Sequence, residues 1–140
     1  MAFYFIAGFL YILPCSAQDN YIIVANKSVQ DQFLSRSTLE NIFLGKKSRW
    51  NDGIQIVPVT LKEGAAHESF INEVIHKSVN AYMNYWRKMI FTGKGVMPIA
   101  FENDIEVMNY INRTEGAIGY ISSKNLMNEF ENIKTIAITE

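Results

Sequence analysis

The stretch "VTLKEGAAHESF" (residues 59–70) has the residue types and spacing that best suit the binding of an anion. An apolar strand is expected to lead into a turn of small residues, and a helix then begins with Phe70 on its first buried turn. Backbone N–H groups that are unpaired at such a helix start can bind an anion. The candidate anion site consists of Lys62, Gly64, Ala65, Ala66 and His67. Glu63 opposes an anion there, and the turn is equally compatible with a plain connection between strand and helix.

No arrangement of residues in the sequence suits catalysis or a cofactor. The two histidines, His67 and His76, are nine residues apart, so they point in opposite senses on one straight helix and cannot share a metal ion there. Ser, Asp and Glu occur without a nucleophile elbow, a paired-carboxylate motif or a histidine-linked triad. We therefore predict no catalytic residue, no metal ligand and no cofactor.

Two clusters outside this turn could also contact a ligand. A basic cluster beside Trp50 could bind an anionic partner, or it could be a solvated loop that Trp50 anchors to the core. Its members are Lys46, Lys47 and Arg49. An aromatic cluster could stack on a ring-bearing ligand, although an aromatic stripe at helical spacing is more often part of a core. Its members are Tyr82, Tyr85 and Trp86.

Strands and capped helices alternate along the chain. The strands are predicted at residues 21–25, 54–61, 116–122 and 133–138. The helices are predicted after Ser37, from 66 to 76, after Ser78 and after Asn103. Pro58 cannot donate a ladder hydrogen bond, so it indicates an edge strand or the end of a strand. The alternation predicts one compact α/β domain, in which the candidate turn follows the second strand.

The composition suits a globular domain that does not bind nucleic acid. The chain has 140 residues, of which 49% are hydrophobic and 19% are charged, and its net charge is -1. Basic and acidic residues are interspersed, whereas a nucleic-acid binder gathers its basic residues on one surface.

The first 17 residues contain no charged side chain and predict a secretory signal peptide. The apolar run within them is too short to span a bilayer, which needs about 20 residues. Pro14 ends the run, and small residues follow at which a signal peptidase could cleave after Ala17. Cys15 could instead carry a lipid, but Pro14 departs from the small residue that a lipoprotein signal has there. A mis-assigned start or a buried first strand would also explain the run; we expect a periplasmic domain at residues 18–140.

Three longer segments of the sequence follow one another in a distinctive order. They are "STLENIFLGKKSRWNDGIQIVPV", "YMNYWRKMIFTGKG" and "TEGAIGYIS". In order and spacing they resemble the phosphate-type periplasmic solute-binding proteins. In that family a short helix with "IF.G" precedes a Trp-containing turn and a strand with "I.PV", and a later helix ends at "GAIGY". The resemblance covers most of residues 21–122.

This resemblance implies a fold and a way of binding phosphate. Family members have two α/β lobes with the ligand in the cleft between them, and this chain is about half their size. We expect a single lobe of a type II periplasmic-binding-protein-like fold, with a mixed sheet flanked by helices. In the family, Ser and Thr hydroxyls, an Arg and backbone N–H groups in the turn after the "I.PV" strand bind the phosphate. Here Gly64, Ala65 and Ala66 replace the hydroxyls, so Lys62 or His67 would have to supply the charge.

The function that the resemblance implies is that of the phosphate-binding component of an ABC transporter. The loss of the hydroxyls implies weak or lost binding of phosphate or another small oxyanion. The protein partner would be a membrane transporter or a periplasmic protein. The alternative is a periplasmic interaction or sensor module without a ligand, whose exposed lobe face binds another protein or a second copy of the chain.

Overall fold

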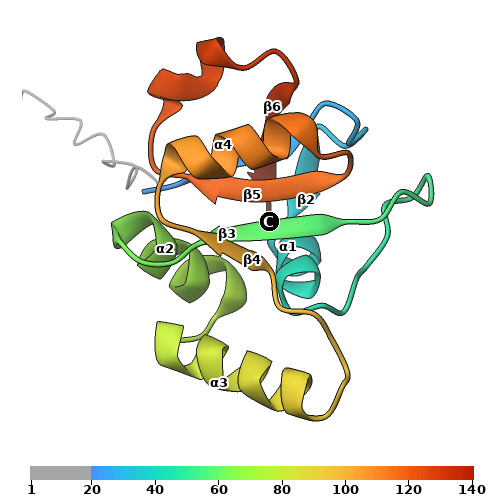
Figure 1. Ribbon diagram of the computed structural model, residues 1–140, viewed down its shortest axis with the longest axis vertical. Coiled ribbons are helices and arrows are strands. Elements are labelled where there is room, and N and C mark those ends of the chain that lie inside the picture. Colours follow the sequence, from blue (N-terminus) through green and yellow to red (C-terminus); the bar gives the residue numbers. More distant parts are fainter. Residues whose placement is uncertain (1–19) are drawn as a thin grey trace, which may run out of the picture.

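A mixed six-stranded sheet forms the centre of the structure, a computed structural model that describes residues 20–140 (Figure 1). The strands lie in the order β2-β6-β1-β5-β3-β4. Their bounds are β1 Ile22–Asn26, β2 Phe33–Ser35, β3 Val57–Leu61, β4 Ile99–Phe101, β5 Ala117–Ile121 and β6 Ile133–Thr139. β1 is antiparallel to β5 and β6, whereas β3 is parallel to both β4 and β5, and β2 is parallel to β6. The carboxyl ends of β3, β4 and β5 therefore lie at the same end of the sheet.

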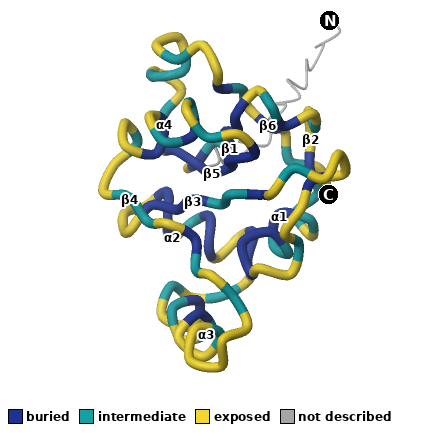
Figure 2. The backbone as a smooth tube through the Cα atoms, turned by 45° about the vertical axis from the view of Figure 1, so that its right-hand side comes forward, coloured by how far each residue is buried: buried dark blue, intermediate teal, exposed yellow. Residues whose placement is uncertain are grey.

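Helices cover both faces of this sheet. Their bounds are α1 Arg36–Phe43, α2 Ala65–Phe70, the π-helical turn η1 Ile71–Ile75, α3 Val79–Phe91, α4 Asp104–Arg113 and the 3-10 helix η2 Lys124–Glu129. α4 lies on one side of the sheet and α1 and α2 on the other, with α3 farther out beyond them (Figures 1 and 2). The expected mixed sheet flanked by helices is confirmed.

A cluster of aromatic rings holds α1 and α2 against the sheet. Phe70 of α2 stacks on Tyr120 of β5 with ring centroids 4.1 Å apart, and Phe43 of α1 meets Phe70 edge-on at 4.8 Å. Tyr21 also meets Phe70 edge-on, at 5.6 Å. All four residues are buried, as is most of the sheet around them (Figure 2). Each such ring pair contributes about 0.5–1.5 kcal/mol beyond the apolar area that it buries.

The helix starts predicted at Ser78 and Asn103 are confirmed. In both, the side-chain oxygen accepts the backbone N–H three residues on, at 3.1 Å and 3.0 Å. The start predicted at Ser37 is wrong, because Ser35 caps α1 and Ser37 lies inside the helix. Capping depends on the backbone of the capping residue, which must be extended, and Ser35 directly ends β2.

Two predicted elements are shorter than expected. The helix expected to residue 76 leaves α-geometry at Ile71–Ile75 and ends at His76, whose φ is 57°. The strand expected from residue 54 begins at Val57. Its first residues bond to the loop before them instead, because Ile54 accepts the N–H of Trp50 and Ile56 donates to Ser48.

Pro58 lies at the beginning of β3, which is an internal strand. The N–H of Val57 donates to Gly116 on the β5 side, and the N–H of Lys62 donates to Phe101 on the β4 side. Since successive residues of a strand face opposite neighbours, the Pro58 nitrogen faces the β4 side. Pairing with β4 starts only at Val59, so the missing N–H leaves no gap in the ladder. The strand-end alternative is therefore the one found, and the edge-strand alternative is wrong.

Within residues 20–140 there is no helix with both the length and the apolar character needed to cross a membrane. The expected signal peptide at residues 1–17 and the lipidation considered at Cys15 lie outside the described residues.

Candidate functional site

A hollow of about 670 Å³ lies where β3, β4 and β5 end. It is bounded by the turn after β3, by the start of α4 and by the residue that follows β5. Its lining residues are Asn20, Leu61, Glu63, Gly64, Ala65, Ala66, Glu102, Asn103, Asp104, Ile105 and Ser122. Open α/β sheets bind their ligands outside the carboxyl ends of the strands, so the hollow has the position of a ligand site.

The predicted turn supplies one wall of this hollow through Gly64, Ala65 and Ala66. Gly64 has φ 103°, a conformation that favours glycine, and it turns the chain sharply from β3 into α2. α2 begins without a side-chain cap, so the N–H groups of its first turn have no side-chain acceptor. The turn can therefore offer backbone N–H groups to a ligand in the hollow.

Lys62 forms an ion pair with a carboxylate of the hollow. Its Nζ donates to Oε1 of Glu102 at 2.6 Å, and this bond raises the pKa of Lys62 above its ordinary value. Both side chains are more than half exposed, so the pair is screened by water. Lys62 is not among the residues that line the hollow, and its charge is partly cancelled by Glu102.

His67 lies inside the protein and away from the hollow. Only 4% of the residue is exposed, and it does not line the hollow, so the structure does not bring His67 to the candidate anion site. Its Nδ1 lies 2.5 Å from the hydroxyl of Tyr120, which also accepts the N–H of Leu61. The Tyr120 hydroxyl proton is then free to go to Nδ1, which places the imidazole proton on Nε2. His67 joins α2 to β3 and β5 through this bond.

The burial of His67 makes stability depend on pH. Burial lowers the pKa of His67 below its ordinary 6.5, because the imidazolium is poorly solvated there. As pH falls below about 6.5, the unfolded chain takes up a proton at this residue and the folded chain does not, so the free energy of unfolding falls. We expect His67→Asn, which keeps an acceptor near Tyr120 but does not titrate, to lose less stability between pH 7.5 and pH 5. Urea unfolding at both pH values measures this, and equal losses in both proteins would contradict it.

Two carboxylates of the hollow, those of Glu102 and Asp104, were not predicted from the sequence. Glu102 and Asp104, from the start of α4, line the same hollow as Glu63. Asp104 accepts the backbone N–H of Ser122 at 3.0 Å and its hydroxyl at 2.6 Å, so it holds α4 to the end of β5. Three carboxylates and one nearby lysine give the hollow a negative balance, which opposes a phosphate dianion.

The basic cluster lies on the loop between α1 and β3, and the aromatic cluster lies on α3. Trp50 is buried, and its Nε1 donates to the carbonyl of Gly116 at 3.0 Å, so it anchors the basic loop to the core. Tyr82 and Trp86 are also buried, and the Tyr82 hydroxyl donates to the carbonyl of Phe43. The core interpretation holds for Trp50, Tyr82 and Trp86.

Residues 20–140 contain no group of three His, Cys, Asp or Glu side chains that could hold a metal ion.

The amino-acid sequence matches no protein-family model and no curated protein. Solved structures do match. An ABC-type phosphate transport receptor from Vibrio cholerae matches with a TM-score of 0.60 at 16% identity, over 86% of this chain and 46% of the receptor. PstS from Borrelia burgdorferi matches with a TM-score of 0.63 at 16% identity, over 87% of this chain and 48% of PstS.

A third match was solved with bound phosphate. This Clostridium perfringens protein of the phosphate ABC transporter type has a TM-score of 0.53 and 16% identity, over 84% of this chain and 53% of its own length. The present chain thus spans about half the length of these three structures. It has the fold of roughly one lobe of the phosphate-transport binding proteins.

Proposed function

We propose that the chain is a non-catalytic binding lobe that takes phosphate, or another small oxyanion, weakly into the hollow at the start of α2. The observation that carries the proposal is the uncapped start of α2, which opens into a hollow at the carboxyl ends of parallel strands. The phosphate-transport proteins with the same fold support the choice of ligand. The site residues proposed are those of the turn, with Gly64, Ala65 and Ala66 offering N–H groups and Lys62 offering charge at the rim.

The physical balance favours weak binding. A helix start favours an exposed anion by about 0.3–1 kcal/mol, and a charge-assisted hydrogen bond adds about 1.5–3 kcal/mol where water is excluded. A millimolar complex needs about 4 kcal/mol in total. The turn of this chain has methyl groups or hydrogen where hydroxyls would serve as donors, and Glu63 and Glu102 subtract from the attraction. One lobe also leaves the opposite side of the ligand in water.

Calorimetric titration with inorganic phosphate is expected to give a dissociation constant of about a millimolar or weaker. Glu63→Gln is expected to tighten binding by about fivefold at low salt, because a unit charge about 4 Å from another contributes about 1 kcal/mol in water. Glu63 lines the hollow and forms no ion pair with any residue that the structure describes.

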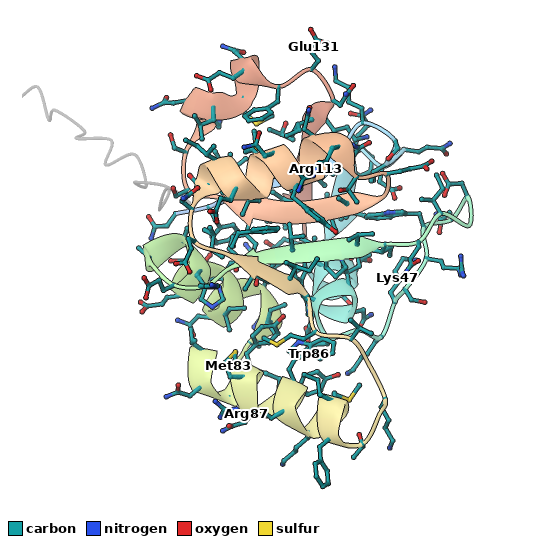
Figure 3. The ribbon with its side chains drawn as sticks, in the orientation of Figure 1. Lys47, Met83, Trp86, Arg87, Arg113 and Glu131 are labelled. Carbon is teal, nitrogen blue, oxygen red and sulfur yellow. The ribbon has the colours of Figure 1, made fainter. Side chains whose placement is uncertain are left out.

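The matched control is Glu131→Gln, which removes the same charge just after η2 from a residue that does not line the hollow (Figure 3). Its affinity for phosphate should equal that of the unchanged protein. No heat up to several millimolar phosphate, in the unchanged protein and in Glu63→Gln alike, would remove the proposal.

The proposed location is the periplasm, and the proposed protein partner is a membrane transporter of the phosphate type. The predicted signal peptide supports the location, and the fold supports the partner.

If phosphate binding fails, the rim of the hollow favours the alternative function, a protein-interaction module. Ile105 is 53% exposed there and would offer a protein partner an apolar contact beside three carboxylates.

A further inference from the structure

The end of α3 and the loop after it expose apolar and basic side chains together. Phe91 is 92% exposed, Val96 is 89% exposed and Ile90 is 54% exposed. Basic side chains lie among them along the helix and the loop. We call this surface the α3 tip; it consists of Arg87, Lys88, Ile90, Phe91, Lys94 and Val96.

The α3 tip is built on ordered backbone. The N–H of Lys94 donates to the carbonyl of Met89 at 2.9 Å, and the hydroxyl of Thr92 donates to that of Lys88 at 2.9 Å. The loop therefore folds back onto the helix end. On the inner face of α3, Trp86 packs beside Gly45 and Gly95, which fixes the helix to the rest of the protein. The backbone that carries the exposed side chains is therefore fixed to the rest of the protein.

The α3 tip also projects from the molecule. α3 lies beyond α1 and α2, at the end farthest from the sheet (Figures 1 and 2). Figure 3 shows Trp86 directed back toward the protein and Arg87 on the opposite side of the helix. The α3 tip thus forms a ridge, and Lys94 and Val96 at its base also help to line a neighbouring hollow.

Positive charge is concentrated in this part of the sequence, although the net charge of the whole chain is -1. Residues 74–101 contain four basic side chains and not one Asp or Glu. The neighbouring hollow of about 370 Å³, lined by Lys47 and Lys94 among others, has no carboxylate in its lining either. Glu63, Glu102 and Asp104 lie at a different hollow, and Glu73 of η1 accepts from the hydroxyl of Tyr21. The complement of the α3 tip is therefore an anionic surface that also accepts apolar side chains.

We propose that the α3 tip docks on an anionic lipid bilayer. Phe91 and Val96 enter the headgroup region, and Lys88, Lys94 and Arg87 lie against lipid phosphates. Apolar side chains flanked by Lys and Arg bind at this depth, and each basic residue near an anionic surface adds to the attraction. A bilayer accepts a projecting ridge without a preformed pocket, whereas an acidic protein would need a groove to match it. This docking does not depend on phosphate binding at the start of α2.

Co-sedimentation with phosphatidylglycerol–phosphatidylcholine vesicles tests the proposal. The chain from Gln18 is used, because it keeps every described element and lacks the apolar residues 1–17 that could bind lipid themselves. We expect binding to these vesicles and little to pure phosphatidylcholine. Lys88→Gln with Lys94→Gln should weaken binding by about 25-fold, about fivefold per charge. Phe91→Ser with Val96→Ser should weaken it by about tenfold or more.

The control variant is Phe33→Ser, which removes another exposed aromatic ring, on β2 away from the tip (64% exposed). It should bind like the unchanged protein. Near-ultraviolet circular dichroism confirms that each variant is folded. At about 1 M salt, where the Debye length is about 3 Å, binding should fall. Absence from both vesicle types, as expected if the α3 tip serves an acidic protein instead, would overturn the proposal. So would binding that survives the tip substitutions or is lost in Phe33→Ser.

Discussion

Replacing Gly116 by alanine is expected to lower the free energy of unfolding by about 3 kcal/mol. A Cβ at this position would lie 2.2 Å from the backbone oxygen of Gln55, which cannot move aside as a flexible side chain would. Gly116 also has φ 78°, which costs an alanine about 1–2 kcal/mol more. Its carbonyl accepts from Trp50 and Val57, so any shift to relieve the clash weakens both bonds. The midpoint and slope of urea unfolding measure the loss.

Gly53→Ala is the control that separates the cost of the steric clash from the cost of the positive φ. Gly53 has φ 88°, and a Cβ there would meet no atom within 4 Å. Its substitution should therefore cost only the conformational part, about 1–2 kcal/mol. If Gly116→Ala and Gly53→Ala had the same midpoint, close packing of Gly116 against Gln55 would not be the reason for glycine there.

The segment "GAIGY" thus has structural reasons for its residues. Gly116 lies against Gln55, and a Cβ on Gly119 would come within 2.6 Å of the side chain of Val59. Tyr120 bonds to His67 and stacks on Phe70. None of these residues lines the hollow. The residues of this segment are therefore explained by the packing of the fold, without a contact to a ligand.

Elements determined by neighbouring residues could be predicted from the sequence. Ser78 and Asn103 cap their helices through bonds that span three residues, and β1 and β5 are short apolar runs. β2 and β4 could not be predicted in this way. Each has three residues, and each is a strand only because a parallel partner, β6 or β3, lies beside it. No local pattern of side chains specifies such a pairing.

In the candidate site, too, local features could be predicted from the sequence and long-range contacts could not. The turn at Gly64 was predictable, because a strand, small residues and a helix start adjoin in the sequence. The carboxylates of Glu102 and Asp104 reach the hollow from the start of α4, which follows β4 at the side of β3. His67 is buried because Tyr120 lies 53 residues away in sequence but next to it in space. The sequence therefore predicts the turn, with Lys62 and Glu63 beside it, but not the carboxylates of Glu102 and Asp104.

Phe70→Ala is expected to lower the free energy of unfolding by about 4 kcal/mol, which is a large part of the total for a domain of this size. The ring is fully buried and touches three other rings, so its removal leaves a cavity and ends each of these contacts. Tyr120 would lose its stacking partner while keeping its hydrogen bond to His67. Urea unfolding followed by circular dichroism measures the loss.

Phe33→Ala is the matched substitution outside the core. Phe33 is 64% exposed on β2, so the same change should alter the free energy of unfolding by about 0.5 kcal/mol or less. Both variants lose the same side chain, so a difference of several kcal/mol between their free energies of unfolding would be due to burial. Together with His67, Phe70 also holds α2, with its turn at the hollow, against β5. If Phe70→Ala proved as mild as Phe33→Ala, the ring cluster would not fix α2, and the geometry proposed for the anion site would lose its support.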